Sequence, residues 1–309
     1  MAESGADRRS RVEDAATRSN RLAEEQSAFR RFMSSRVVWQ FRRSRNGMIG
    51  LVLTLFVLFL ALFGPLLAPH DPIFFELGKQ NASPTLEHPL GNDQLGRDIL
   101  SRLLHGARIT LLITAGAVAL AVVGGTILGL TAGFRGGWVD HIIMRAVDIV
   151  LAMPTFLLAI AIVAALGPST QNVIIAVGVG ALPDFARISR GSTMAVKQED
   201  FALAAQSIGA SSVRIVTRHV LPNVTAPLLV QTTLRLAMAI LTASGLSFLG
   251  LGPQPPAPEW GAMLSSGRNF IHNSPQLIII PGLAILMATI GFNLLGDGLR
   301  DALDPRLKQ

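Results

Sequence analysis

Six long apolar segments constrain this chain more than any other feature of its sequence. A helix needs roughly 20 apolar residues to cross the hydrocarbon core of a bilayer. The segments that approach this length are Gly47–Leu67, Ile109–Leu130, Ile142–Leu166, Val173–Phe185, Ala226–Leu249 and Leu277–Leu295. Charged residues make up only 15% of the chain, against roughly 25% in soluble domains, and the mean hydropathy is +0.46. We therefore predict an all-α membrane protein with six transmembrane helices.

The cationic residues predict how these helices are oriented. Lys and Arg collect in cytoplasmic connections, and here they precede the first segment and recur after every second one. The residues concerned are Arg30, Arg31, Arg36, Arg42, Arg43 and Arg45, then Arg135, the stretch Arg187–Arg218, and Arg300, Arg306 and Lys308. Both termini and the loop 186–225 are then cytoplasmic, and the loops 69–106 and 250–276 are external. Because topology accounts for the net charge of +7, no nucleic-acid partner is expected.

The polar stretch 1–46 is interpreted as a cytoplasmic tail that precedes the transmembrane domain, residues 47–309. It is too polar and too rich in arginine for a cleaved signal peptide. The composition of its opening part is typical of disorder.

A polar island, Glu199–Asn223, interrupts the apolar pattern and predicts two short helices. The apolar positions that recur at helical spacing in the first of them are Phe201, Ala204, Ala205 and Ile208. Such a stripe suits a helix that another protein grips, but it equally suits a helix that lies on lipid or on its own bundle. Gly209 should end this first helix.

The second short helix follows at once. Ser211 or Ser212 can cap its beginning, and the cations Arg218 and His219 suit its last turn. Pro222 is predicted to end it.

Glycine and proline mark the helix contacts of the transmembrane domain. Gly125, Gly129 and Gly133 are spaced by four, which predicts a face where another helix packs closely. A flexible gating point is the alternative. Pro154 should kink the third span.

Charged residues are scarce within the predicted spans. Arg145 and Asp148 lie three residues apart and are predicted to pair, or to line a pathway, since intramembrane charges seldom face lipid. Arg235 must face protein or water, unless the fifth span begins later. A secondary transporter needs carboxylates near the bilayer midplane, and beyond Asp148 the spans are expected to hold essentially none.

The residues of soluble catalysis are missing. The chain has no cysteine, which excludes disulfides, thiolate chemistry and cysteine-ligated metals. The one Gly-Lys pair, Gly78-Lys79, is followed by Gln80 and belongs to no phosphate-binding loop. The six histidines are scattered without metal-ligand spacing. We expect no enzyme, no cofactor and no metal site in this chain.

Several motifs resemble one transporter family in the same order along the chain. The run Phe201–Gly209 resembles the EAA signature of ABC importer permeases, with Ala204, Ala205 and Gly209 matching and Leu203 in the acidic position. The segment Leu90–Arg102 resembles the Gly-Arg-Asp block of C-type dipeptide, oligopeptide and nickel permeases. The matching stretches extend from about Leu90 to Arg306 and include the turn Gly136-Gly137-Trp138-Val139-Asp140.

This resemblance implies a MetI-like type I ABC importer fold in a bacterial inner membrane. It also implies a second, homologous permease subunit as a heterodimer partner, two ATPase subunits that hold ATP and Mg²⁺, and an external solute-binding protein. The ATPase-coupling residues would be Phe201, Leu203, Ala204, Ala205, Ile208, Gly209 and Arg214, and the pathway residues Arg145, Asp148 and Arg235. Peptides are the expected cargo, and nickel chelates, glutathione-like compounds or other small solutes are the less favoured alternatives. A membrane scaffold or sensor that docks an ATPase without transport stays open from the residues alone.

Overall fold

The computed structural model describes residues 36–303, and this part of the chain contains helices and no β-strand. The expected disorder at the beginning of the tail falls outside the described residues. The longer helices are α3 (Arg45–Leu67), α4 (Ile99–Arg135), α5 (Gly137–Leu151), α6 (Thr155–Leu166), α7 (Thr170–Lys197), α10 (Leu221–Phe248) and α12 (Gln276–Leu303). The shorter ones are α2 (Arg36–Arg43), α8 (Asp200–Ser207), α9 (Ser212–Ile215), a π-helical turn (Val216–Val220), α11 (Trp260–Gly267) and a 3₁₀ turn (Arg268–Phe270).

Helices α4 and α7 pack against each other along the glycines that the sequence singled out. A Cβ added to Gly125 would lie 2.6 Å from the backbone oxygen of Leu182, and one added to Gly133 would lie 2.8 Å from that of Arg190. At Gly129 the added atom would collide with the backbone oxygen of Ala186. The prediction of a close helix contact is therefore confirmed.

A bent pair of helices, α5 with α6, adds one more crossing between the two ends of the bundle to those of the five spanning helices. Five helices are long and apolar enough to cross a membrane, and α5 with α6 forms a bent pair whose two members meet at 89°. Lys197, at the end of α7, donates to the backbone oxygen of Phe134, at the end of α4. Since α4 and α7 finish at the same end, the segment between them must return the chain to the other end. The pair thus takes the place of the predicted span Ile142–Leu166, which was expected to be kinked at Pro154.

The break between α5 and α6 lies where the sequence predicted a kink. Pro154 is the N-cap residue of α6, and α5 finishes at Leu151. A proline ring removes one backbone donor and clashes with the preceding turn. The bend of 89° is larger than a kinked helix would show.

The prediction that Pro222 ends a helix is wrong. Residues Ser212–Phe248 form one continuous helical run, in which Pro222 lies in the first turn of α10. The π-helical turn directly before it widens the helix, which leaves room for the ring. Asn223 Nδ2 donates to the backbone oxygen of His219 (2.7 Å) and so satisfies one of the carbonyls next to this proline.

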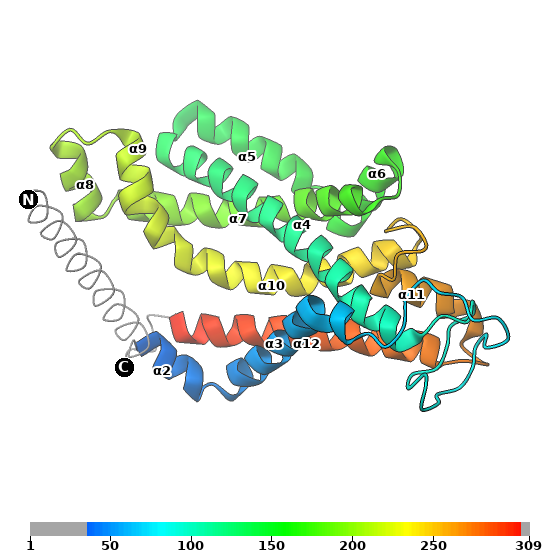
Figure 1. The fold of residues 1–309 in the computed structure, drawn as a ribbon. Coiled ribbons are helices and arrows are strands. Elements are labelled where there is room, and N and C mark those ends of the chain that lie inside the picture. The colour runs from blue at the N-terminus through cyan, green and yellow to red at the C-terminus, as the bar shows by residue number, and fades with distance from the viewer. Residues whose placement is uncertain (1–35, 304–309) are drawn as a thin grey trace, which may run out of the picture.

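The two ends of the bundle differ in what they carry (Figure 1). Helix α8 lies at the end where α2 begins and α12 finishes. The irregular segment 68–98 and α11 lie at the opposite end. The predicted cytoplasmic loop 186–225 and the two predicted external loops thus lie at opposite ends. The end that carries the segment 68–98 and α11 is named the external end after the predicted topology.

Candidate functional site

Helix α8 exposes a set of apolar side chains at one end of the bundle. Ala202 and Ala205 are buried against the rest of the chain. The side chains that point outward include Phe201, Leu203, Ala204 and Ile208, and Ile208 is 85% exposed. The predicted stripe is thus divided. Ala205 permits close approach to this chain's own core, while Phe201, Ala204 and Ile208 form a face that residues 36–303 leave uncovered.

The turn after α8 is built as the sequence predicted. Gly209 has a φ of +80°, the left-handed conformation that favours glycine at the end of a helix. The backbone N–H of Ala210 donates to the oxygen of Ala205 (3.1 Å), which closes the cap. Ser211, rather than Ser212, caps the next helix by accepting from the N–H of Arg214 (3.4 Å). Arg214 itself is exposed.

A hollow of about 420 Å³ lies beside this turn, between the end of α4 and the segment Ser212–Thr217. Its α4 wall comprises Leu130, Thr131, Phe134 and Arg135. The cap of α8, the π-helical turn and this hollow thus lie at one end of the molecule. No pattern in the sequence indicated the hollow, because its two walls are far apart along the chain.

Three ion pairs connect α7 to its neighbours. Arg190 forms a two-pronged pair with Asp140 of α5 (2.5 and 2.6 Å), and Arg187 pairs with Asp148 (2.7 Å). The prediction that Asp148 pairs with Arg145 is therefore wrong. Helix α5 packs on α7, and this contact brings Arg187 to the Asp148 carboxylate. Arg145 is exposed.

The third ion pair places a carboxylate inside a predicted span. Arg235 of α10 pairs with Asp184 of α7 at 2.6 Å, and both side chains are about one quarter exposed (26% and 28%). The prediction that Arg235 faces protein or water is confirmed. The expectation of essentially no carboxylate beyond Asp148 is wrong, since Asp184 lies inside the predicted span Val173–Phe185.

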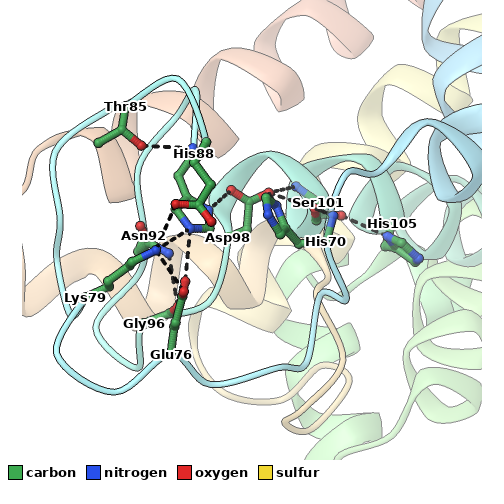
Figure 2. Close-up of polar contacts among 11 residues, drawn as sticks. His70, Glu76, Lys79, Thr85, His88, Asn92, Gly96, Asp98, Ser101 and His105 are labelled. Atoms are coloured by element: carbon green, nitrogen blue, oxygen red, sulfur yellow. Dashed lines mark hydrogen bonds and ion pairs between the residues drawn. The ribbon is translucent and has the colours of Figure 1, made fainter.

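The external Gly-Arg-Asp block forms a buried polar network at the beginning of α4 (Figure 2). Asp98 caps this helix by accepting from the N–H of Ser101 (2.7 Å), and Arg97 pairs with Asp93 (2.7 Å). Farther out, the Lys79 ammonium donates a hydrogen bond to Glu76, which holds the pKa of that carboxyl below its usual range. The block therefore fixes the external loop to the bundle.

These sites suit movement and docking more than covalent chemistry. One end offers an uncovered apolar face on a capped helix. Ion pairs between helices converge on α7.

Comparison with protein-family models places most of the chain in two matches. Residues 125–309 match the model described as "Binding-protein-dependent transport system inner membrane component". Residues 26–86 match the model "N-terminal TM domain of oligopeptide transport permease C".

Curated relatives are similar over nearly the whole chain. The dipeptide transport system permease protein DppC of Alkalihalophilus pseudofirmus is 44% identical over 87% of this chain and 88% of the relative. The di/tripeptide transport system permease protein DppC of Pseudomonas aeruginosa is 45% identical over 87% and 91%. The glutathione transport system permease protein GsiD of Escherichia coli is 46% identical over 87% and 89%.

Two solved structures share the fold. One is the MetNI methionine ABC transporter in inward-facing conformations, with a TM-score of 0.51 and 20% identity, over 66% of this chain and 97% of that chain. The other is an amino acid ABC transporter with histidines, with a TM-score of 0.50 and 15% identity, over 63% and 91%. The expected MetI-like fold is confirmed.

Proposed function

This chain belongs to the family of inner membrane components of binding-protein-dependent transport systems, and from this premise we propose that it translocates peptides or a similar small solute when ATPase subunits move helix α8. The chain is a multi-pass permease subunit of an ABC importer. The dipeptide, di/tripeptide and glutathione transporters among its relatives support the peptide class of cargo.

The observation that carries the coupling role is the uncovered apolar face of α8. Exposed apolar side chains on a rigidly capped helix lose water when a partner covers them, and each large side chain that is fully buried contributes about 1.5–3 kcal/mol. We infer that ATP and Mg²⁺ bind, and ATP is hydrolysed, in the subunits that cover this face. Closure of those subunits would push α8, and the continuous run Ser212–Phe248 would transmit the push into the membrane.

The remaining partners follow from the same family. A second, homologous permease subunit would complete the pathway as a heterodimer, and an external solute-binding protein would deliver the cargo. Two of the residues predicted to line the pathway form ion pairs: Asp148 with Arg187, and Arg235 with Asp184. We include these two partners among the pathway residues. Arg235 lies about 20 Å along α10 from the Phe248 end at 1.5 Å per residue, well within a bilayer. Charges at such depth are costly against lipid, so these pairs should face the pathway or the partner permease.

One experiment tests coupling at α8. The complete importer is reconstituted in proteoliposomes with Ala204→Glu, and with Gln206→Glu as the matched control on the same helix. Both residues are exposed, but only Ala204 lies in the apolar face. We expect Ala204→Glu to abolish solute-stimulated ATP turnover and uptake, and Gln206→Glu to retain both. Equal activity of the two variants would remove the docking role, and ATPase binding without any uptake by the unaltered complex would favour a scaffold or sensor.

A second experiment tests the pathway. The chain has no cysteine, so single cysteines can be labelled without background. Asp148→Cys should react with a charged, water-soluble thiol reagent in the assembled importer, and solute should change the rate. Leu62→Cys, on a side chain that is 70% exposed on the apolar α3, should stay unreactive because it faces lipid. Equal protection of both cysteines would place Asp148 outside the pathway.

A further inference from the structure

The external loop brings together two histidines that lie far apart in the sequence. The rings of His70 and His88 lie with their centroids 4.5 Å apart and are tilted by 33° to each other. One ligand-type atom from each of His70, His88 and Glu87 lies within 4.8 Å of the others. Figure 2 shows His70 and His88 in the polar network in front of α4. Sequence spacing gave no sign of this group, because the loop folds back on itself to form it.

His88 is surrounded by carboxylates in a way that calls for a cation. Its Nδ1 lies 3.0 Å from Asp98 Oδ1, and its Nε2 lies 3.0 Å from Glu76 Oε2. A neutral imidazole has one N–H, so if Nδ1 donates to Asp98, the lone pair of Nε2 faces another acceptor. This contact is favourable only when a proton or another cation lies between the two atoms.

Lys79 supplies positive charge at this place. Its ammonium lies 2.8 Å from Glu76 Oε1, 3.1 Å from Glu87 Oε2 and 3.4 Å from His88 Nε2. Lysine is a point charge on a flexible stem, and the Lys79 side chain is 37% exposed. It can therefore leave the site without disturbing the fold.

His70 offers a further ligand atom without a partner. Its Nδ1 is buried and makes no hydrogen bond, and the nearest carboxylate oxygen, on Asp98, is 3.8 Å away. The His70 backbone N–H donates to Ser101 Oγ (3.0 Å), which holds the residue in place. Glu87 is 64% exposed at its side chain, so one side of the group is open to water.

We propose that His70, His88 and Glu87 bind a divalent first-row transition ion, for which Zn²⁺ is the best fit. Two imidazoles and one carboxylate with an open fourth position form a common zinc ligand set, whereas Mg²⁺ and Ca²⁺ prefer oxygen ligands. Bonds of about 2.0–2.1 Å separate tetrahedral ligands by roughly 3.4 Å, so the loop contracts around the ion. Asp98 fixes the His88 ring through Nδ1, as outer carboxylates do in zinc sites.

The ion clamps the external loop. It connects Glu87 and His88 to His70, which the hydrogen bond from its backbone to Ser101 ties to the first turn of α4. Lys79 holds the same acceptors when the metal is absent and is displaced when it binds. The site is a resident one and does not depend on the transported solute, and it replaces the expectation of no metal in this chain.

The test is Zn²⁺ binding to the purified full chain in detergent, carrying an affinity tag without histidine. A chromophoric chelator competes for the ion. We expect one equivalent bound, with Mg²⁺ and Ca²⁺ unable to displace it. His70→Asn should weaken binding more than about tenfold, and His272→Asn, on the other external loop, should leave it unchanged. X-ray absorption at the zinc edge should report two imidazole ligands.

A gain-of-affinity variant protects the test against misfolding. Lys79→Met removes a like charge next to the ion and should tighten binding at least about fivefold. Zn²⁺ should also raise the unfolding temperature of the unaltered chain, and do so less for His70→Asn. Binding that is the same in His70→Asn, His272→Asn and the unaltered chain would overturn the proposal, as would weaker binding in Lys79→Met. Since all measurements use the isolated chain, they are independent of coupling and uptake.

Discussion

The two ends of the molecule differ in which side chains they bury and which they expose. At the external end, charged side chains such as Arg97, Asp98 and Glu259 are buried, and hydrogen bonds or ion pairs within the chain satisfy them. At the α8 end, apolar side chains such as Phe201 and Ile208 are exposed, and the described part of the chain leaves them uncovered. The buried charges at the external end thus have partners within the chain, whereas the apolar side chains on the outer face of α8 have none in its described part.

This difference separates stability from function. Substitutions in the external network should lower the free energy of unfolding of the isolated chain, because buried charges lose their partners. Substitutions on the outer face of α8 should leave that free energy almost unchanged and act only in the assembled importer.

The largest effect is expected for Asp98→Ala. The Asp98 side chain is 1% exposed, caps α4 and faces His88, so its removal leaves buried groups unpaired. We expect a loss of about 3–5 kcal/mol, measured by denaturant titration of the purified chain. Asp71→Ala in the same loop is the control, since that carboxylate accepts one exposed hydrogen bond from Ile73. Similar losses for both variants would show that burial does not govern this loop.

Gly129→Ala tests the glycine seam, the contact of Gly125, Gly129 and Gly133 of α4 with α7. The added methyl group would collide with the backbone of α7, and such overpacking costs about 1–3 kcal/mol. Gly191→Ala is the control on α7, because a Cβ there has nothing within 4 Å. It should stabilise the chain by about 0.5–1 kcal/mol through helix propensity. If Gly129→Ala were as stable as Gly191→Ala, the α4–α7 contact would be looser than described.

The glycine seam also shows what could be predicted from sequence. Local patterns were sufficient where the constraint is local. The spacing of Gly125, Gly129 and Gly133 predicted a helix contact, Gly209 predicted the end of α8, and Pro154 predicted a kink where the structure has a sharper bend. Each of these acts through its own backbone or through the single helix against which it packs.

Non-local contacts were the ones that the sequence hid. Asp184 stands inside the predicted span Val173–Phe185 and could have been read from the sequence, but its pairing with Arg235 of α10 could not. Asp148 was paired with the wrong arginine for the same reason. Pro222 was misread since the preceding π-helical turn, which accommodates it, has no sequence signature. His70 and His88 looked scattered until the loop brought them together.

Glu259 gives the external end a pH dependence. Burial raises the pKa of its carboxyl, so the folded chain holds the proton more tightly than the unfolded chain, where the pKa is about 4.3. The stabilisation is complete below that value and is lost as the pH rises through the folded-state pKa. Unfolding temperatures of the unaltered chain should therefore fall relative to Glu259→Gln as the pH rises above about 4.3. A constant difference between the two proteins over this range would contradict the prediction.

Ile208→Ser should have the smallest effect of all on the isolated chain, although Ile208 is a large apolar residue. Its side chain is 85% exposed, so the folded state gains little from it, and we expect a change within about 0.5 kcal/mol. Ala205→Ser, one turn earlier and 7% exposed, replaces a buried methyl with a hydroxyl and should cost more, because that hydroxyl loses its water. Denaturant titration of both purified chains measures the difference. A loss of more than about 1 kcal/mol for Ile208→Ser would mean that Ile208 packs on its own bundle, and the apolar face of α8 would then no longer require a partner.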